Sequence, residues 1–174
     1  MFHSLVVRTG LVCLAFASIS GIASAQTKVA VINLQRAVLE SDEIKKASDA
    51  LQTKYKPRQQ ELEKLQADLD RIQQTLSNGA GKLSPQGEAD LQAEGQRKQR
   101  DLQRKGDDLQ GDVDRERNEI LSKSSKQMQE VVSVIAKEKG YDIVVDVSNT
   151  VFFKPALEIT TDAIAAYNKA HPAK

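Results

Sequence analysis

A polar stretch from residue 42 to residue 139 sets the strongest limit on how this chain can fold. It is rich in Gln, Lys, Arg, Asp, Glu, Ala and Leu, most of which lose little side-chain freedom in a helix. Its apolar residues first follow one another at the a/d spacing of a heptad coiled coil, at Leu62, Leu65, Leu69, Ile72 and Leu76. They continue more loosely at Leu91, Leu102, Leu109, Val113 and Ile120. Because so narrow a stripe cannot form a globular core, the sequence predicts long helices packed along one seam.

The segment SNGAGKLSP, residues 77–85, interrupts this pattern. A glycine-rich turn there ends one helix, and the next begins with Ser84 as N-cap and Pro85 at the first helical position. Two helices joined by a short turn form an antiparallel hairpin. At about 1.5 Å per residue they extend roughly 55 Å and 80 Å. We therefore expect residues 42–139 to form an arm, with its tip at 77–85.

Two features are expected to weaken this arm. Pro57 lacks an amide hydrogen and should kink the first helix near its base. Four glycines fall in the second helix, each costing about 1 kcal/mol relative to alanine: Gly87, Gly95, Gly106 and Gly111. They are either neutral surface changes or positions that make the arm compliant.

Sequence patterns typical of β-strands occur only before and after the polar stretch. KVAVINL, residues 28–34, predicts a strand, and a short helix from Gln35 to Glu40 should follow it, after which the Ser41 hydroxyl could cap the first arm helix. Gly140 should end the second arm helix. YDIVVDV, residues 141–147, alternates as a strand does, and TVFFK, residues 150–154, predicts a second strand after a turn. A closing helix is expected from Asp162, capped by Thr160 or Thr161.

The first 25 residues have the organisation of a secretory signal peptide. Arg8 precedes an apolar run from Leu11 to Ile19, and Ala23-Ser24-Ala25 forms a small-x-small cleavage site. The run is shorter than the roughly 20 residues of a membrane-spanning anchor. A lipoprotein through Cys13 is the other alternative. Cleavage after Ala25 removes Cys13 and leaves 24 basic and 24 acidic residues, so charge predicts no nucleic-acid partner.

The apolar material at the two ends is too small to stand alone. Three short strands with little covering them are marginal, and after cleavage no cysteine remains for a disulfide or a thiolate metal site. We therefore predict an α+β, mostly α, homo-oligomer with a small β-rich body, residues 26–41 and 140–174, from which the hairpins project. Its shared core should contain Val29, Val31, Ile143, Val145, Val147 and Phe152.

Four segments carry a family resemblance. KVAVINLQRAVLES, YKPRQQELEKLQADL, KGYDIVVD and EITTDAIAAYNK, taken in this order, resemble the Skp (OmpH-like) family of periplasmic chaperones. The resemblance implies a jellyfish-like homotrimer whose hairpins enclose a cavity. It also implies a periplasmic holdase that keeps unfolded outer-membrane β-barrel proteins soluble without ATP, with lipopolysaccharide or another anionic lipid as a further partner.

Residues 97–105, RKQRDLQRK, form a candidate basic band. They contain Arg97, Lys98, Arg100, Arg104 and Lys105 beside a single acid, Asp101. The band could attract acidic client segments or lipid phosphates. The alternative is a solvated helix face with i to i+4 ion pairs, which are common and individually weak.

The sequence also bears on two other classes of function, an enzyme and a structural adaptor. An enzyme finds little support, because Leu83 follows Gly81-Lys82 where a phosphate loop needs Ser or Thr, and His171 has no candidate catalytic partner. No cofactor or metal is expected. A non-enzymatic coiled-coil adaptor of the cell envelope, docking through its hairpin tip, is the second alternative.

Overall fold

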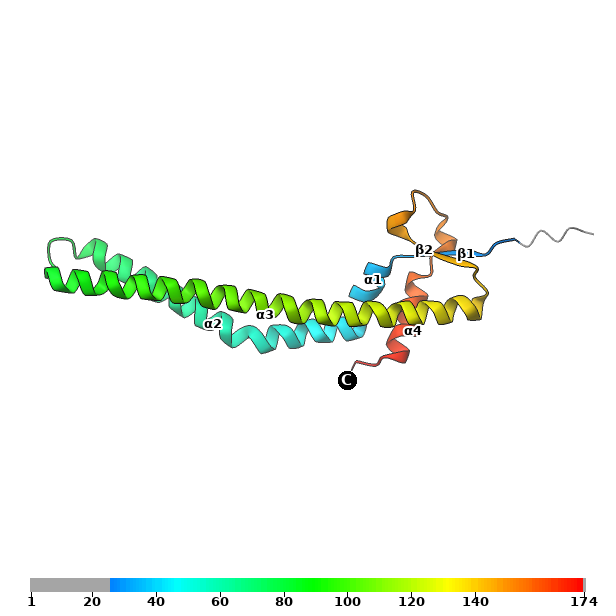
Figure 1. The fold of residues 1–174 in the computed structure, drawn as a ribbon, viewed down its shortest axis with the longest axis horizontal. Coiled ribbons are helices and arrows are strands. Elements are labelled where there is room, and N and C mark those ends of the chain that lie inside the picture. The colour runs from blue at the N-terminus through cyan, green and yellow to red at the C-terminus, as the bar shows by residue number, and fades with distance from the viewer. Residues whose placement is uncertain (1–25, 174) are drawn as a thin grey trace, which may run out of the picture.

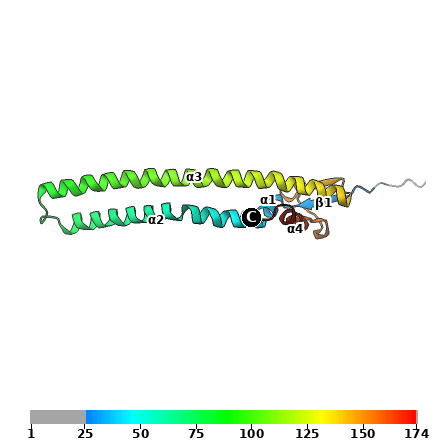
Figure 2. The ribbon, with the colours of Figure 1, turned by 90° about the horizontal axis from the view of Figure 1, so that it is seen from below.

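A long helical hairpin dominates the computed structural model, which describes residues 26–173 (Figures 1 and 2). Helix α2 spans Asp42–Asn78 and α3 spans Pro85–Lys139, the bounds at which the sequence places the two arm helices. In Figure 1, α2 lies on one side of α3 near the body and on the other side near the tip, so the helices wind around each other. The expected signal peptide, residues 1–25, lies outside the described residues.

Local signals set the ends of the arm helices. The Ser84 hydroxyl accepts a hydrogen bond from the Gly87 amide at 3.1 Å, and Pro85 occupies the first helical position. Gly140 ends α3 in the left-handed region with φ 66°. Helix α2 continues through Pro57, so the proline does not end it.

The body lies at the end of the arm opposite the tip. Strand β1, Val29–Ile32, pairs in parallel with β2, Ile143–Asp146. The strands are parallel because the hairpin carries the chain out and back before β2 begins. Two short helices complete the body, α1 at Leu34–Leu39 and α4 at Thr160–Ala170.

The core lies between one face of the sheet and the helices α1, α3 and α4. Its buried side chains are Ala30, Ile32, Ala37, Val38, Ile44, Met128, Val131, Val132, Ile135, Ile159, Ala163 and Tyr167. Four of these twelve side chains, Met128, Val131, Val132 and Ile135, come from the last turns of α3, where the sequence becomes more apolar. The α+β, mostly α fold class with a helical hairpin is confirmed.

The second predicted strand, Thr150–Lys154, is wrong. Residues Val147–Asn149 form a 3-10 turn, η1, and 150–154 are irregular until a second 3-10 turn, η2, at Pro155–Leu157. The available edge of β1 is taken instead by the chain after η2, where the Ile159 amide donates to the Val31 carbonyl at 2.9 Å. The turn η1, in which the Asp146 carboxylate accepts from the Ser148 amide at 2.8 Å, separates β2 from residues 150–154, which pair with neither strand.

Two smaller expectations also need correction. The Ser41 hydroxyl does not cap α2, because it donates to the Val38 carbonyl at 2.7 Å. Helix α4 begins at Thr160 rather than Asp162, with Ile159 at the N-cap position. The Thr160 side chain is used elsewhere, since it accepts from the Asn33 amide at 2.9 Å.

Candidate client-binding and assembly surfaces

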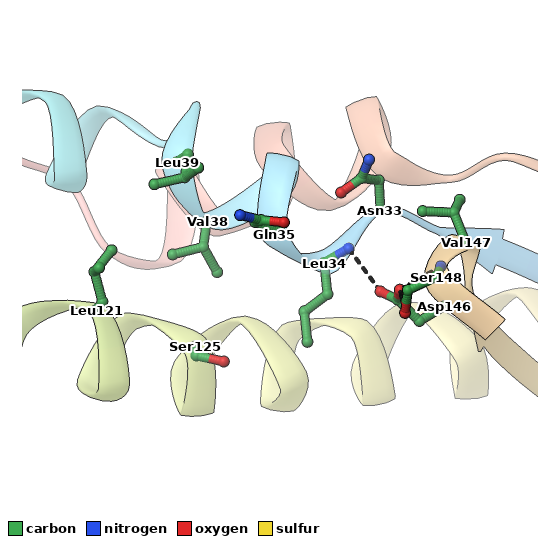
Figure 3. Close-up of a pocket in the computed structure, with 10 residues that line it drawn as sticks. All are labelled: Asn33, Leu34, Gln35, Val38, Leu39, Leu121, Ser125, Asp146, Val147 and Ser148. Atoms are coloured by element: carbon green, nitrogen blue, oxygen red, sulfur yellow. Dashed lines mark hydrogen bonds between the residues drawn. The ribbon is translucent and has the colours of Figure 1, made fainter. Parts of the chain in front are cut away.

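An apolar groove of about 480 Å³ opens between α1, α3 and the end of β2 (Figure 3). Figure 3 shows Val38 of α1 and Leu121 of α3 facing each other across it. The residues that line the groove are Asn33, Leu34, Gln35, Val38, Leu39, Leu121, Ser125, Asp146, Val147 and Ser148. Leu39 remains 43% exposed, so the groove presents apolar surface to solvent.

Asp146 forms the polar end of this groove. Its carboxylate accepts hydrogen bonds from the Leu34 amide at 3.0 Å and the Ser148 amide at 2.8 Å. Hydrogen bonds from the Ser148 hydroxyl and from both amides lower the pKa of Asp146. The ionised carboxylate thereby holds the start of α1 and the turn η1 against the sheet.

A second groove, of about 390 Å³, continues from the first along α3. The two share Leu34 and Asp146, and the second is also lined by Val132, Ala136 and Val144. It lies beside β2, whose outer edge has no backbone partner within residues 26–173. An extended chain could therefore meet apolar side chains and unpaired backbone groups at one place.

Four of the six residues predicted to form the oligomer core lie together on one face of the sheet, and the other two lie in the segment after β2. The register pairs Val29 with Ile143 and Val31 with Val145, so these four residues share the sheet face opposite the core. Ile143 is 51% exposed, whereas Val31 is already buried within the protomer. Val147 lies in η1 and Phe152 in the irregular segment after it, 81% exposed. Sequence reasoning missed Val151, which is fully exposed beside Phe152.

The arm carries ion pairs between its two helices. Lys54 reaches Glu116 at 2.6 Å, Arg58 reaches Asp112 at 2.6 Å, and Lys98 reaches Asp68 at 2.9 Å. A fourth pair joins Lys105 to Glu61. Because each partner sits at a fixed position along the other helix, the pairs define the register of a hairpin whose apolar seam is narrow. The sequence held no local signal for them.

Three of these pairs lower the pKa values of their acids. A hydrogen bond from Arg58 lowers the pKa of Asp112, and one from Lys98 lowers the pKa of Asp68. Lys54 and then Tyr55 lower the pKa of Glu116 by donating to its carboxylate. All three acids are therefore held ionised at neutral pH.

The structure divides the candidate basic band. Lys98 and Lys105 face α2 and pair with its acids, and Arg104 pairs with Asp101 at 3.1 Å. Arg97 and Arg100 make no ion pair within the described part of the chain. The five residues thus do not form one continuous basic surface.

Two further observations concern the side chains and helices of residues 26–173. No group of three or more acidic, histidine or cysteine side chains is arranged to hold a metal ion there. None of the helices in this range combines the length and apolar character needed to cross a membrane.

Comparison with known proteins assigns the chain. The family model described as outer membrane protein (OmpH-like) matches residues 28–167. The chain belongs to the OmpH-like family. It is 29% identical over 147 residues to a Skp-like protein of Pseudomonas aeruginosa, covering 84% of this chain and 88% of that protein. The predicted membership of the Skp (OmpH-like) family is confirmed, and the coarse assignment to a chaperone family of the cell envelope follows from it.

A solved structure shares the fold. It is that of an OmpH-like protein of Caulobacter crescentus, described as a candidate outer membrane chaperone. The TM-score is 0.70 at 21% identity, covering 86% of this chain and 89% of the other. The hairpin and the small body therefore recur in a distant relative.

Proposed function

We propose that this chain is an ATP-independent periplasmic holdase, which binds unfolded outer-membrane β-barrel proteins and keeps them soluble until delivery to the outer membrane. The match of the OmpH-like family model to residues 28–167 carries the proposal. The two continuous apolar grooves at the base of a long polar arm add physical support. Export with cleavage after Ala25 would place the protein in the periplasm.

The mechanism rests on many weak contacts. The grooves offer apolar patches to exposed client segments, while most of the arm is polar, so each contact stays exchangeable. Several arms around one client raise the effective concentration of the remaining contacts after any one breaks. Release then requires no nucleotide, only a downstream acceptor that binds the client more tightly.

We propose a homotrimer as the working assembly. A parallel sheet is normally covered on both faces, yet here one face carries the half-exposed Ile143 and β2 has an open edge. Val151 and Phe152 add exposed apolar surface in the irregular segment nearby in sequence. Identical copies that covered this face would complete the sheet and bury these side chains.

An envelope adaptor is the alternative, and one observation weighs against tip docking. Leu83, the apolar side chain of the tip turn, packs within 2.8 Å of where a Cβ on Gly79 would stand. It is half-buried by the turn rather than offered to a partner. Leu83 therefore serves the turn itself.

The decisive experiment dilutes a urea-denatured outer-membrane β-barrel protein into buffer without ATP and follows light scattering. We expect the chain, at a stoichiometric concentration of trimer, to suppress aggregation. An inert coiled-coil protein of similar length at the same mass concentration is the control. Aggregation equal to that of the control would reject the holdase and favour the adaptor.

A further inference from the structure

The first turn of α2 takes its cap from a residue far away in the chain. Ser41 stands at the N-cap position, but its hydroxyl donates to the Val38 carbonyl and leaves the helix uncapped locally. The Asn168 side-chain oxygen accepts from the Asp42 amide at 3.0 Å instead. The first amides of a helix have no partner within the helix, so this contact supplies one from α4.

Tyr167, the residue before Asn168, adds a second contact with the first turn of α2. Its ring is fully buried, its hydroxyl donates to the Glu43 carboxylate of α2, and the hydroxyl oxygen lies 3.1 Å from the side-chain oxygen of Gln127 in α3. Two successive residues of α4 therefore contact both arm helices where these leave the body.

Helix α4 is itself fixed to the sheet at its other end. The Asn33 amide, which directly follows β1, donates to the Thr160 hydroxyl at 2.9 Å. The Ile159 amide donates to the Val31 carbonyl at 2.9 Å. Because α4 is anchored at its beginning and contacts the arm near its end, it connects the sheet to the arm base.

We propose that α4 positions the arm, with Asn168 and Tyr167 as the positioning residues that fix where α2 begins and how the hairpin leaves the body. The hairpin is long and its seam narrow, so a small change of direction at the base becomes a large displacement at the tip. Arm position affects client binding only under the proposed function, whereas the inference itself can be tested without a client.

Hydrogen exchange tests the cap. In Asn168→Ala the Asp42 amide should exchange about fivefold faster, which is the change expected from the loss of one helix cap of about 1 kcal/mol. Asn168→Asp keeps an acceptor oxygen and should restore protection. Lys169→Ala, at an exposed neighbouring position of α4, is the matched control and should exchange as the wild type does.

Distance measurement tests the position of the arm. Spin labels at Ala80→Cys in the tip and Ala165→Cys in α4 occupy exposed sites, and with Cys13→Ser they are the only cysteines in the chain. Labelled protein is diluted with an excess of unlabelled protein so that only distances within one protomer are measured. We expect a wider distance distribution in Asn168→Ala and Tyr167→Phe, and wild-type width in Asn168→Asp and Lys169→Ala.

Unchanged exchange at Asp42 together with an unchanged distribution in a folded Asn168→Ala protein would overturn the inference. If Asn168→Ala unfolds, the distance distribution of Tyr167→Phe tests the positioning role instead, because this variant removes one oxygen atom and keeps the buried ring. A Tyr167→Phe protein with the wild-type distribution would then overturn it. Failure of the aggregation assay alone would reject the holdase and leave the positioning role intact.

Discussion

At the scale of single residues, Asp146 has the most connections among the groups that organise the body. One carboxylate holds the start of α1 and the turn η1, and it closes the end of the apolar groove. We expect Asp146→Ala to lower the free energy of unfolding by about 1–2 kcal/mol, because two backbone amides lose their acceptor. Urea unfolding followed by circular dichroism measures the change, and Asp107→Ala on the exposed face of α3 is the control.

The pH dependence of that difference follows from the lowered pKa of Asp146. A depressed folded-state pKa contributes stability that is present above the unfolded pKa, about 4, and is lost as pH falls through the folded value. The gap between wild type and Asp146→Ala should therefore be full at pH 7 and shrink in acid below about pH 4. A gap that stays constant down to that range would contradict the assigned role of the ionised carboxylate.

The charge band yields a second prediction for individual side chains. Arg97→Gln with Arg100→Gln removes basic groups that have no ion-pair partner in residues 26–173, whereas Lys98→Gln with Lys105→Gln breaks two contacts between the arm helices. If the band attracts acidic client segments or lipid phosphates, the arginine pair should weaken client capture at low salt and leave arm stability unchanged. The lysine pair should lower arm stability. If the wild type and the arginine variant capture client equally well, the alternative holds and the basic residues form only a solvated helix face.

At the scale of elements, the glycines of α3 and the glycine that ends α2 have different surroundings. A Cβ built on Gly106 or Gly111 meets nothing within 4 Å, whereas one on Gly79 in the tip turn would lie 2.7 Å from the Thr75 carbonyl oxygen. We expect Gly106→Ala and Gly111→Ala each to stabilise the arm by about 1 kcal/mol, and Gly79→Ala to destabilise it. Thermal unfolding followed at 222 nm compares the three. A double alanine variant of α3 no more stable than wild type would contradict the prediction.

The same variants separate the two interpretations of these glycines. A stiffened arm that captures large and small clients as the wild type does would mean that the glycines are neutral. Reduced capture of the larger clients alone would mean that compliance serves the proposed function.

The ion pairs between α2 and α3 are a second property of these elements. Arg58→Glu places like charges at its contact with Asp112 and should lower the stability of the arm, and the exchanged pair Arg58→Glu/Asp112→Arg should recover part of it. Since the pKa values of Asp68, Asp112 and Glu116 are lowered, the stability from these pairs should be present above about pH 4 and lost as pH falls below it. Helicity measured against pH in low salt checks both statements.

The sequence predicted those elements whose signals are local. The ends of α3 are marked by residues close in sequence, Ser84 and Pro85 at its start and Gly140 at its end. The arm was therefore predictable from the sequence alone. Partners distant in the chain could not be predicted. Asn168 caps a helix that begins 126 positions earlier, and Glu158 and Ile159, rather than residues 150–154, pair with β1. The cross-helix partners of Lys98 and Lys105 likewise depend on a register that only the folded hairpin fixes.

At the scale of the whole molecule, the arm and the body differ in how much of their polar and apolar surface is covered within one protomer. The arm forms most of its backbone hydrogen bonds within its own helices, and ion pairs such as Arg58–Asp112 and Lys98–Asp68 join the two helices. The body buries one face of its sheet against α1, α3 and α4, and leaves the other face partly open together with the outer edge of β2. Apolar side chains that remain exposed in such a body support the proposed assembly of identical copies.

The proposed trimer can be tested at this open face. We expect Ile143→Ser combined with Phe152→Ser to shift the species seen by native mass spectrometry from trimer towards monomer, because both side chains would be buried by neighbouring copies. Val134→Ser is the matched control, since Val134 is 53% exposed on α3 and lies outside the predicted oligomer core. It should leave the mass unchanged. A double serine variant that remains a trimer at high dilution would mean that the copies meet elsewhere, and a wild-type protein that is monomeric, folded and protected from exchange in its strands would reject assembly itself.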